Sequence, residues 1–438
     1  MNIKSFRSNQ LRGKKLLLLA GNLVGTDDII NYAKANGIYT IVTDYLPKEQ
    51  SFGKLLADEY WDISTADFEK LSKEILKNHI DGVFAGVGEF NMLKAMELCN
   101  HFGFPYYCTR EQWDLIENKD SFRLLCEKHG VPCPKTYYIG CDIHEDTLQT
   151  IKYPVIVKPV DSSSSIGITI CEEEENLNEA IQFAIENSGR KRIIIEDYFV
   201  GEEFTAHYTI VNGKVSLACV DNRVPVAVHS GTVTTIPVAR VYPSSFIRDY
   251  IEQVNDSMIK LCESLNLNTG VLFIQGLFNK EKKEFCIFEG GLRCAGEAAY
   301  RIIERINGNN FMNLLVDYTL LGKAVNYDVE AEDPFMNGKT CCVTSFVSKG
   351  GKVGKIIGYD EVMQKVPNIV SSECRYHEGD VTPNGDTLRQ ILLRFVLVCD
   401  SKEQLIDDVD TINKTVTVIN DKGEDMCLVF DARDYFKT

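Results

Sequence analysis

The chain has 438 residues, 44% of them hydrophobic, with a formal net charge of −16 and a pI of about 5.0. This length suffices for several packed cores, whereas the acidic balance argues against nucleic acid, whose phosphates attract basic surfaces. No apolar run approaches the ~20 residues of a membrane span. The fifteen cysteines, an odd number without metal-ligand spacing, predict reduced thiols in the cytoplasm.

The N-terminal part alternates between short apolar runs and helix-like segments. Strands are predicted at 15–21, 39–44 and 82–86, and helices at 27–36 and 68–78. This β-α-β alternation predicts a parallel sheet, whose ligands lie beyond the carboxyl ends of its strands. Three polar residues near such ends are either turn formers and caps or acceptor-substrate contacts: Asn22, Asp44 and Glu89.

The most specific motif is a lysine at the end of an apolar strand, just before a turn of small residues. Lys158 ends this run, and five small residues follow it closely: Ser162, Ser163, Ser164, Ser165 and Gly167. A buried lysine is costly unless it meets an anion, and amides and hydroxyls of such a turn can wrap phosphate oxygens. The motif predicts a polyphosphate clamp, with a surface hairpin as the alternative. It is not a Walker loop, because no Gly-Lys-Ser/Thr opens a helix.

The segment 192–204 is a β-branched strand that leads into an acidic turn. Its extended backbone offers amide and carbonyl groups to an adenine edge. We expect these contacts, largely through the backbone, from four consecutive residues: Glu196, Asp197, Tyr198 and Phe199. Glu203 follows and is a candidate acceptor for ribose hydroxyls.

A hairpin is predicted from the runs 271–278 and 284–289 with the turn 279–283 between them. Gln275 lies inside the first apolar strand and Glu289 ends the second. Oxygen ligands on neighbouring strands suit Mg²⁺, which uses few protein ligands together with nucleotide phosphates. The pair is therefore a candidate metal site.

The last segment has a different character. Strands are expected at 341–347, 354–358, 392–398 and 415–419, with a helix at 402–413. No cluster of catalytic residue types stands out in it. We expect it to cover the active site or to form the surface of a homodimer.

These motifs, in this order, resemble the ATP-grasp superfamily from residue 16 to 323. Lys158 with its serine loop resembles the phosphate loop. The Val-His-Ser-Gly segment 228–231 resembles a His-Ser/Thr-Gly segment of the carbamoyl-phosphate synthetase large subunit. Gln275, Glu289 and Arg293 resemble that branch's Gln…Glu-x-Asn-x-Arg metal and phosphate site.

The resemblance implies ATP and Mg²⁺, with Mn²⁺ as an alternative metal, and it adds three residue roles. Lys119 matches a lysine that reaches the nucleotide phosphates, and His229 would donate to a phosphoryl oxygen. Arg293 would stabilise the transferring phosphoryl group or the acyl phosphate. The family's asparagine falls at Gly291, which offers no side-chain ligand, so substrate and water would complete one metal site. Two flanking arginines, Arg223 and Arg240, are either substrate-carboxylate contacts or rim salt bridges.

The implied fold combines α/β and α+β parts: an N-terminal Rossmann-like parallel sheet, a central pair of ATP-grasp subdomains and a C-terminal α+β lobe. The expected boundaries are a mobile arm at 1–14, a pre-ATP-grasp α/β domain at 15–105, a small subdomain with the phosphate loop at 106–190, a large subdomain with the metal site at 191–326 and the lobe at 327–438.

The predicted function is an ATP-dependent carboxylate–amine ligase that acts through an acyl phosphate on an amino acid or a small carboxylic acid. Such chemistry depends on positioning and electrostatics rather than on a protein nucleophile. Two alternatives stay open. One is a carboxylase-type enzyme that makes carboxyphosphate from bicarbonate. The other is a nucleotide-binding protein with degenerate ligase activity, which Gly291 keeps open. The expected partners are small-molecule carboxylates and amines, with no nucleic acid and no membrane.

Overall fold

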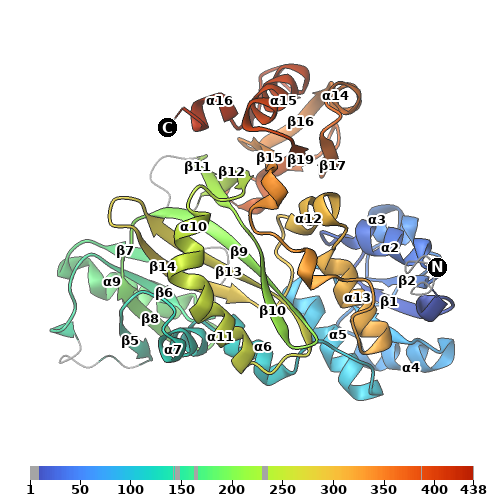
Figure 1. Cartoon of the computed structure of the whole chain (residues 1–438), viewed down its shortest axis with the longest axis horizontal. Coiled ribbons are helices and arrows are strands. Elements are labelled where there is room, and N and C mark those ends of the chain that lie inside the picture. The colour runs from blue at the N-terminus through green and yellow to red at the C-terminus, as the bar shows by residue number, and fades with distance from the viewer. Residues whose placement is uncertain are drawn as a thin grey trace.

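The structure is a computed structural model that describes residues 9–141, 143, 148–161, 166–228, 235–385 and 387–437. Figure 1 shows an N-terminal domain, a central region built on two sheets and a C-terminal lobe. This is the mixed α/β and α+β architecture that the sequence predicts. Within the described ranges, no helix is both long and apolar enough to cross a membrane.

The N-terminal domain is a parallel sheet of order β3-β2-β1-β4 with helices around it. Its elements are β1 Lys15–Leu19, α2 Thr26–Ala35, β2 Tyr39–Thr43, η1 Lys48–Gln50, α3 Phe52–Leu56, β3 Glu59–Trp61, α4 Phe68–Asn78, β4 Gly82–Phe84 and α5 Glu89–Phe102. The predicted helices and strands are present. Helix α4 begins where Asp67 accepts a hydrogen bond from the Lys70 amide. It buries Leu71 and Ile75, which share one face at i, i+4 spacing.

The predicted mobile arm is wrong for residues 9–14. Leu11 is fully buried in the main core, and the Gly13 amide donates to the Gly37 carbonyl at 2.8 Å. The sequence is basic and polar there, yet Leu11 and backbone hydrogen bonds tie the segment to the N-terminal domain. Residues 1–8 lie outside the described ranges.

The central region consists of two antiparallel sheets. The small sheet, of order β5-β8-β6-β7, contains β5 Thr136–Gly140, β6 Val155–Pro159, β7 Thr169–Cys171 and β8 Ile193–Asp197, with helix α9 Leu177–Glu186 on one face. The large sheet, of order β10-β9-β13-β14, contains β9 Glu202–Val211, β10 Lys214–Val220, β13 Thr269–Asn279 and β14 Glu284–Gly291. One of its faces is covered by α10 Ile247–Tyr250, the π-helical turn η3 Ile251–Asn255 and α11 Asp256–Ser264.

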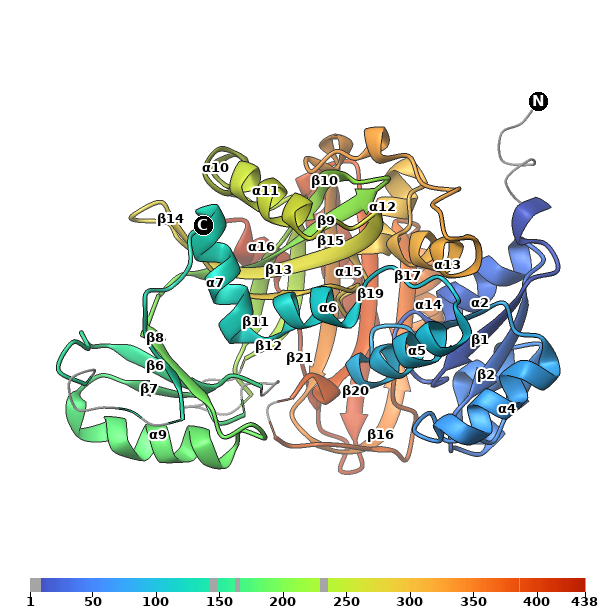
Figure 2. The ribbon, with the colours of Figure 1, turned by 90° about the horizontal axis from the view of Figure 1, so that it is seen from below.

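The two sheets lie between helix α9 on one side and helices α10 and α11 on the other (Figure 2). The faces of the two sheets that are turned away from α9, α10 and α11, called the inner faces below, therefore face one another. Helices α6 Arg110–Glu117 and α7 Lys119–His129 lead from the N-terminal domain to this region. Helices α12 Ala299–Asn307 and α13 Phe311–Leu321 follow β14, and α13 packs on α2 and β4.

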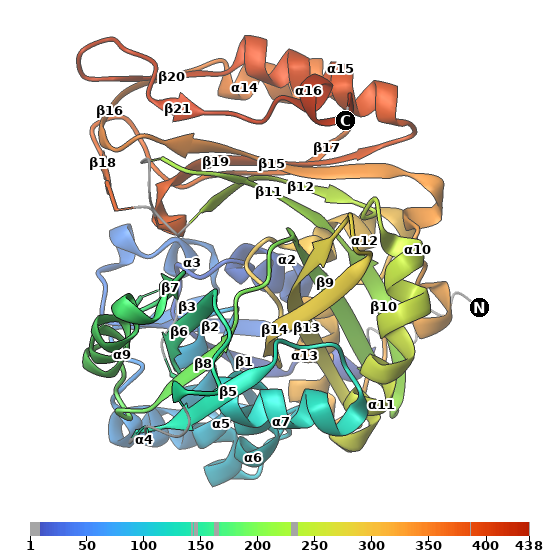
Figure 3. The same cartoon turned by 90° about the vertical axis from the view of Figure 1, so that its left-hand side faces the viewer.

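The C-terminal lobe is built on a sheet of order β11-β12-β15-β19-β17 that β21 extends. Its strands are β11 Asn222–Val226, β12 Ile236–Tyr242, β15 Thr340–Ser348, β17 Ile369–Cys374, β19 Ile391–Cys399 and β21 Cys427–Leu428. A second sheet contains β16 Gly351–Ile357, β18 Val381–Thr382 and β20 Thr417–Asn420. Helices α14 Tyr359–Lys365, α15 Lys402–Thr415 and α16 Ala432–Tyr435 lie on the outer side (Figure 3).

Strands β11 and β12 correct the predicted boundary at 327. Their sequence falls inside the predicted large subdomain, yet β12 pairs with β15 from Ala239↔Thr344 to Tyr242↔Cys341. Their apolar side chains belong to the core of the lobe. Strand partners are set by long-range packing, which a local pattern does not reveal. The lobe is thus continuous with the central region rather than a separate appendage.

Candidate functional site

Lys158 lies on the inner face of the small sheet. Val155 and Val157 pack against helix α9, so the alternation of β6 directs Lys158 the other way. Its side chain is only 6% exposed, and Nζ lies 2.6 Å from Oε2 of Glu196 on the neighbouring strand β8. The strand-end lysine therefore has a buried carboxylate partner.

Arg123 completes this arrangement from helix α7. Its Nε donates to Oε1 of Glu196 at 2.6 Å, and its Nη1 donates to the Ile287 carbonyl of β14 at 2.8 Å. Burial pushes the pKa of Glu196 upward, but Lys158 and Arg123 outweigh burial and leave that pKa below its usual range. One buried arginine thus joins the small sheet to the large sheet.

The sequence prediction missed Arg123. The carboxylate of Glu196 is fully buried between two cations, and its backbone lies in register with Ile156. The expected adenine contact of Glu196, largely through its backbone, stays a prediction. A helical arginine on a face that also carries apolar residues is the signal that was overlooked.

The hinge between the two sheets follows Glu196. The Asp197 amide donates to the Lys135 carbonyl and the Tyr198 amide donates to the Pro154 carbonyl, so both amides are already engaged. Phe199 follows, half-buried. An adenine contact by this segment stays a prediction.

A pocket of about 410 Å³ adjoins the hinge. Asp197 and Phe199 line it together with Gln253 and Phe285. Phe285 packs on Phe246 and Tyr250, on the helix-covered side of the large sheet. This pocket therefore lies behind the hinge and not between the inner faces.

The loop after Lys158 is anchored at both ends. Asp161 accepts hydrogen bonds from the Ser188 hydroxyl at 2.7 Å and from the Arg190 amide at 2.8 Å. Gly167 has φ +78°, and a Cβ there would lie 2.7 Å from Pro159, so glycine is required. The predicted loop residues Ser162, Ser163, Ser164 and Ser165 lie outside the described residues, as does His229.

Lys119 is the first residue of helix α7, four positions before Arg123. It is half-buried. A cation at a helix start gains nothing from the helix dipole. The position therefore suits contact with an external anion, which stays a prediction.

Glu203 and the metal-site candidates lie on the large sheet. Residues Phe204, Phe278 and Phe285 face the helices, so Glu203, Phe273 and Gln275 occupy the inner face by alternation. Glu203 pairs with Arg223, whose Nη1 lies 2.7 Å from Oε2 of the carboxylate. Arg223, a candidate contact for a substrate carboxylate, is thus already paired with a carboxylate of the protein.

Gln275 and Glu289 are direct neighbours across β13 and β14. A bulge next to this pair lets both side chains share the inner face. Both are half-buried. Two adjacent oxygen ligands with further positions left for phosphate and water fit Mg²⁺. Among the residues that the structure describes, no group of three His, Cys, Asp or Glu side chains is arranged to hold a metal.

Gly291 faces Phe273 across the same two strands. The guanidinium carbon of Arg293 lies 4.8 Å from the centroid of the Phe273 ring. Oε1 of Glu117 accepts a hydrogen bond from the Leu292 amide at 3.0 Å and lies 3.7 Å from Nε of Arg293. Burial, together with Glu89 and Glu289, raises the pKa of Glu117 to about 7, against the lowering effect of Arg293. Nothing in the sequence pointed to Glu117.

The chain after Arg293 enters a buried charged region. The Glu297 carboxylate accepts a hydrogen bond from His207 Nε2 at 2.6 Å, and despite burial the nearby Arg240 helps to hold the pKa of Glu297 at about 2. Arg240 itself pairs with Asp221 at 2.7 Å and is buried, so it is not a rim salt bridge. Arg394 of the lobe donates to the Gly296 carbonyl at 2.8 Å. The lobe thereby helps to hold the segment that carries Arg293.

Three candidates in the N-terminal domain differ in their surroundings. Asp44 accepts hydrogen bonds from the Gly21 amide and the Ser51 hydroxyl, and Asn22 binds the backbone of Phe52. Both therefore serve local structure. Glu89 is exposed at the start of α5.

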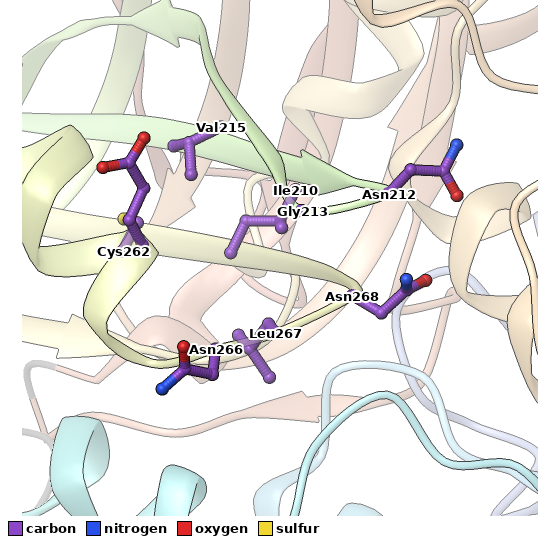
Figure 4. Close-up of a pocket in the computed structure, with 9 residues that line it drawn as sticks. Ile210, Asn212, Gly213, Val215, Cys262, Asn266, Leu267 and Asn268 are labelled. Carbon is purple, nitrogen blue, oxygen red and sulfur yellow. The ribbon is translucent and has the colours of Figure 1, made fainter.

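A second pocket, of about 340 Å³, lies at the opposite end of β9 and β13 (Figure 4). Its labelled residues include Asn212, Asn266 and Asn268. Thr269 and Val211 pair at this end of the sheet, whereas Gln275 pairs with Thr205 towards the other end. The pocket is separate from the candidate site.

Comparison with known proteins agrees with this geometry. Residues 135–260 match the family model described as the D-ala D-ala ligase C-terminus. The chain is 25% identical over 268 residues to the carbamoyl phosphate synthase large chain of Clostridium perfringens, which covers 59% of this chain and 23% of the relative. It is 33% identical over 97 residues to the D-alanine–D-alanine ligase of Fusobacterium nucleatum, which covers 22% of this chain and 29% of the relative.

Solved structures share almost the whole fold. The L-amino acid ligase from Bacillus licheniformis superposes with a TM-score of 0.74 at 17% identity, covering 93% of this chain and 99% of the other. Phosphoribosylglycinamide synthetase from Anaerococcus prevotii gives 0.73 at 18% identity, covering 93% and 99%. The biotin carboxylase domain of 2-oxoglutarate carboxylase from Hydrogenobacter thermophilus, in complex with MgADP and bicarbonate, gives 0.72 at 17% identity, covering 92% and 90%.

Residues 135–260 are thus similar to the D-ala D-ala ligase C-terminus family, and the chain shares its fold with the solved ligase, synthetase and carboxylase structures. The sequence is also similar to carbamoyl phosphate synthase large chains and, over a shorter stretch, to D-alanine–D-alanine ligases. It spans about a quarter of the length of those carbamoyl phosphate synthase chains.

Proposed function

We propose that this protein is an ATP-dependent, ADP-forming ligase that joins a carboxylate to an amine through an acyl phosphate. One observation carries the proposal. The inner face of the small sheet presents Lys158, and the inner face of the large sheet presents Gln275 and Glu289, with Arg293 stacked on Phe273 of that same face. Cationic and metal-ligating groups thus come from two faces that face one another. That arrangement suits a nucleotide polyphosphate between them.

The nucleotide would be held mainly by charge and shape. Lys119 and Lys158 bind phosphates, and the loop from Ser162 to Gly167 closes over them. The hinge residues Asp197, Tyr198 and Phe199 contact adenine, and Glu203 binds ribose. Gln275 and Glu289 would hold Mg²⁺, which when bound neutralises charge that develops on the phosphates.

The reaction has two steps. The γ-phosphoryl group leaves the terminal oxygen of ADP and bonds to an oxygen of the substrate carboxylate. The amine nitrogen then bonds to the acyl carbon, the bond from that carbon to the phosphate oxygen breaks, and the nitrogen loses a proton. Arg293 and His229 stabilise the phosphoryl group during transfer. No protein nucleophile is needed, because positioning and electrostatics supply the acceleration.

The second candidate is formation of carboxyphosphate from bicarbonate. It is favoured by the match to carbamoyl phosphate synthase large chains and by the fold shared with a biotin carboxylase domain. In that case the same cationic groups act, and bicarbonate takes the place of the substrate carboxylate. Cytoplasmic location and a homodimer stay predictions.

The test is ADP release by the purified chain with Mg·ATP. The first arm supplies pairs of amino acids and small carboxylic acids, and the second supplies bicarbonate with ammonia or amines, with products followed by mass spectrometry. We expect stimulation in the first arm and an amide product. Stimulation by bicarbonate alone selects the second candidate, and no stimulation in either arm overturns both.

A further inference from the structure

Gly291 occupies a position from which other side chains are excluded. A Cβ built on Gly291 would lie 2.1 and 2.4 Å from two ring carbons of Phe273 and 3.0 Å from Oε1 of Glu117. Its φ is not positive, so the exclusion is steric and not conformational. The space beside Glu289 on β14 is therefore filled by an aromatic ring and a carboxylate that come from other elements.

These two groups also hold Arg293 from two sides. The guanidinium carbon lies 4.8 Å from the centroid of the Phe273 ring, and Nε lies 3.7 Å from Oε1 of Glu117. A cation over an aromatic face is attracted most strongly where water is excluded, and both Phe273 and Glu117 are largely buried. The Nε atom is buried without a hydrogen-bond partner among the described residues.

Glu117 connects this arginine to the other phosphate candidate. It is the last residue of α6, and Lys119 opens α7 two positions later. The hydrogen bond from the Leu292 amide to Oε1 of Glu117 fixes the turn before Arg293 onto that junction. The chain segments that carry Arg293 and Lys119 are thus joined through one carboxylate.

We propose that Phe273 and Glu117 are positioning residues for Arg293 and that together they replace a side chain at position 291. The ring and the carboxylate hold the guanidinium so that it faces the transferring phosphoryl group. This inference rests on the proposed function of the same site. It predicts that loss of either residue lowers kcat while ATP binding is largely retained.

The experiment compares Phe273→Leu and Glu117→Gln with Phe278→Leu as the matched control. Phe278 is buried on the same strand but faces the helices, so its truncation tests packing without touching Arg293. We expect Phe273→Leu and Glu117→Gln to lower kcat about tenfold or more, with the Kd of Mg·ATP changed less than about threefold. Phe273→Tyr, which keeps the aromatic face, should retain most of kcat, and Phe278→Leu should lower Tm alone.

A second readout does not depend on activity. With arginine labelled by ¹⁵N, the Nε–H signal of Arg293, assigned through Arg293→Lys, should shift in Phe273→Leu and Glu117→Gln and stay in place in Phe278→Leu. If no acceptor stimulates the wild type, the proposed function fails, and this signal still tests the positioning. An unmoved signal, or an unchanged kcat in an active enzyme, overturns the inference.

Discussion

The Nζ atom of Lys158 lies 2.6 Å from Oε2 of Glu196, and both side chains are almost fully buried on the inner face of the small sheet. Arg123 shares the same carboxylate. Because two cations surround one carboxylate, the group of three side chains has a net positive charge, and it faces the large sheet. A buried pair of this kind is costly to break, because the remaining charge has no solvent.

Replacing Lys158 with Met should weaken Mg·ATP binding. A charge-assisted contact with phosphate contributes about 1.5–3 kcal/mol, which corresponds to roughly 10- to 150-fold in Kd. Isothermal calorimetry measures the affinity, and Tm reports any loss of folding. Lys214→Met is the control, because Lys214 is exposed at the other end of the large sheet. Unchanged ATP affinity in Lys158→Met would remove the lysine from the phosphate site.

Glu289→Gln should nearly abolish turnover while ATP still binds weakly. The change removes the anionic ligand of the Gln275–Glu289 pair but keeps its shape. ADP release measured against Mg²⁺ concentration gives the dependence. Glu284→Gln, an exposed position on the same strand, should behave as wild type. Near-normal activity of Glu289→Gln at limiting Mg²⁺ would place the metal elsewhere.

Gly291→Asn should lower both stability and activity. The new Cβ collides with the Phe273 ring, and overpacking of this kind costs about 1–3 kcal/mol. The double variant Gly291→Asn/Phe273→Ala relieves the collision and should recover Tm relative to the single variant. ADP production and thermal melting of all three proteins test this. A nearly inactive wild type that the single change activates would instead identify a degenerate site.

Asp317→Asn should flatten the dependence of stability on pH. Asp317 on α13 accepts a hydrogen bond from Tyr32 at 2.6 Å, and burial raises its pKa to about 7 from a model-peptide value of 3.8. Because the folded pKa is the higher one, the folded state binds more protons between these values. The contribution of this group to the free energy of unfolding is fully present below about pH 4 and is lost as pH rises towards 7.

The limiting slope of this loss is about 1.4 kcal/mol per pH unit. Denaturant unfolding of wild type and Asp317→Asn at pH 5.5 and pH 8 gives the difference between the two proteins. The free energy of unfolding of the variant should increase relative to that of the wild type as pH rises. A constant difference would show that Asp317 is ionised in the folded state throughout this range.

Much of the fold and part of the site were predictable because local patterns determine them. Helix α4 begins and ends at the predicted residues, and the Gln275–Glu289 hairpin forms around the predicted turn. Alternation along β6 already implies that Lys158 faces away from the valines of its strand. The hydrophobic period of a helix or strand and the residues of a turn are set by neighbours in the sequence. Both can therefore be predicted without the tertiary structure.

Tertiary structure decided which of these faces and side chains meet. Strands β11 and β12 joined the sheet of the lobe, and Arg123 reached Glu196 from a helix 73 positions away. The ring of Phe273 fills the space that a side chain at position 291 would occupy. Such contacts depend on how buried surfaces fit and on charges that must be paired once water is excluded. A single sequence records that a residue is apolar or charged, but the partner is selected only when the sheets pack.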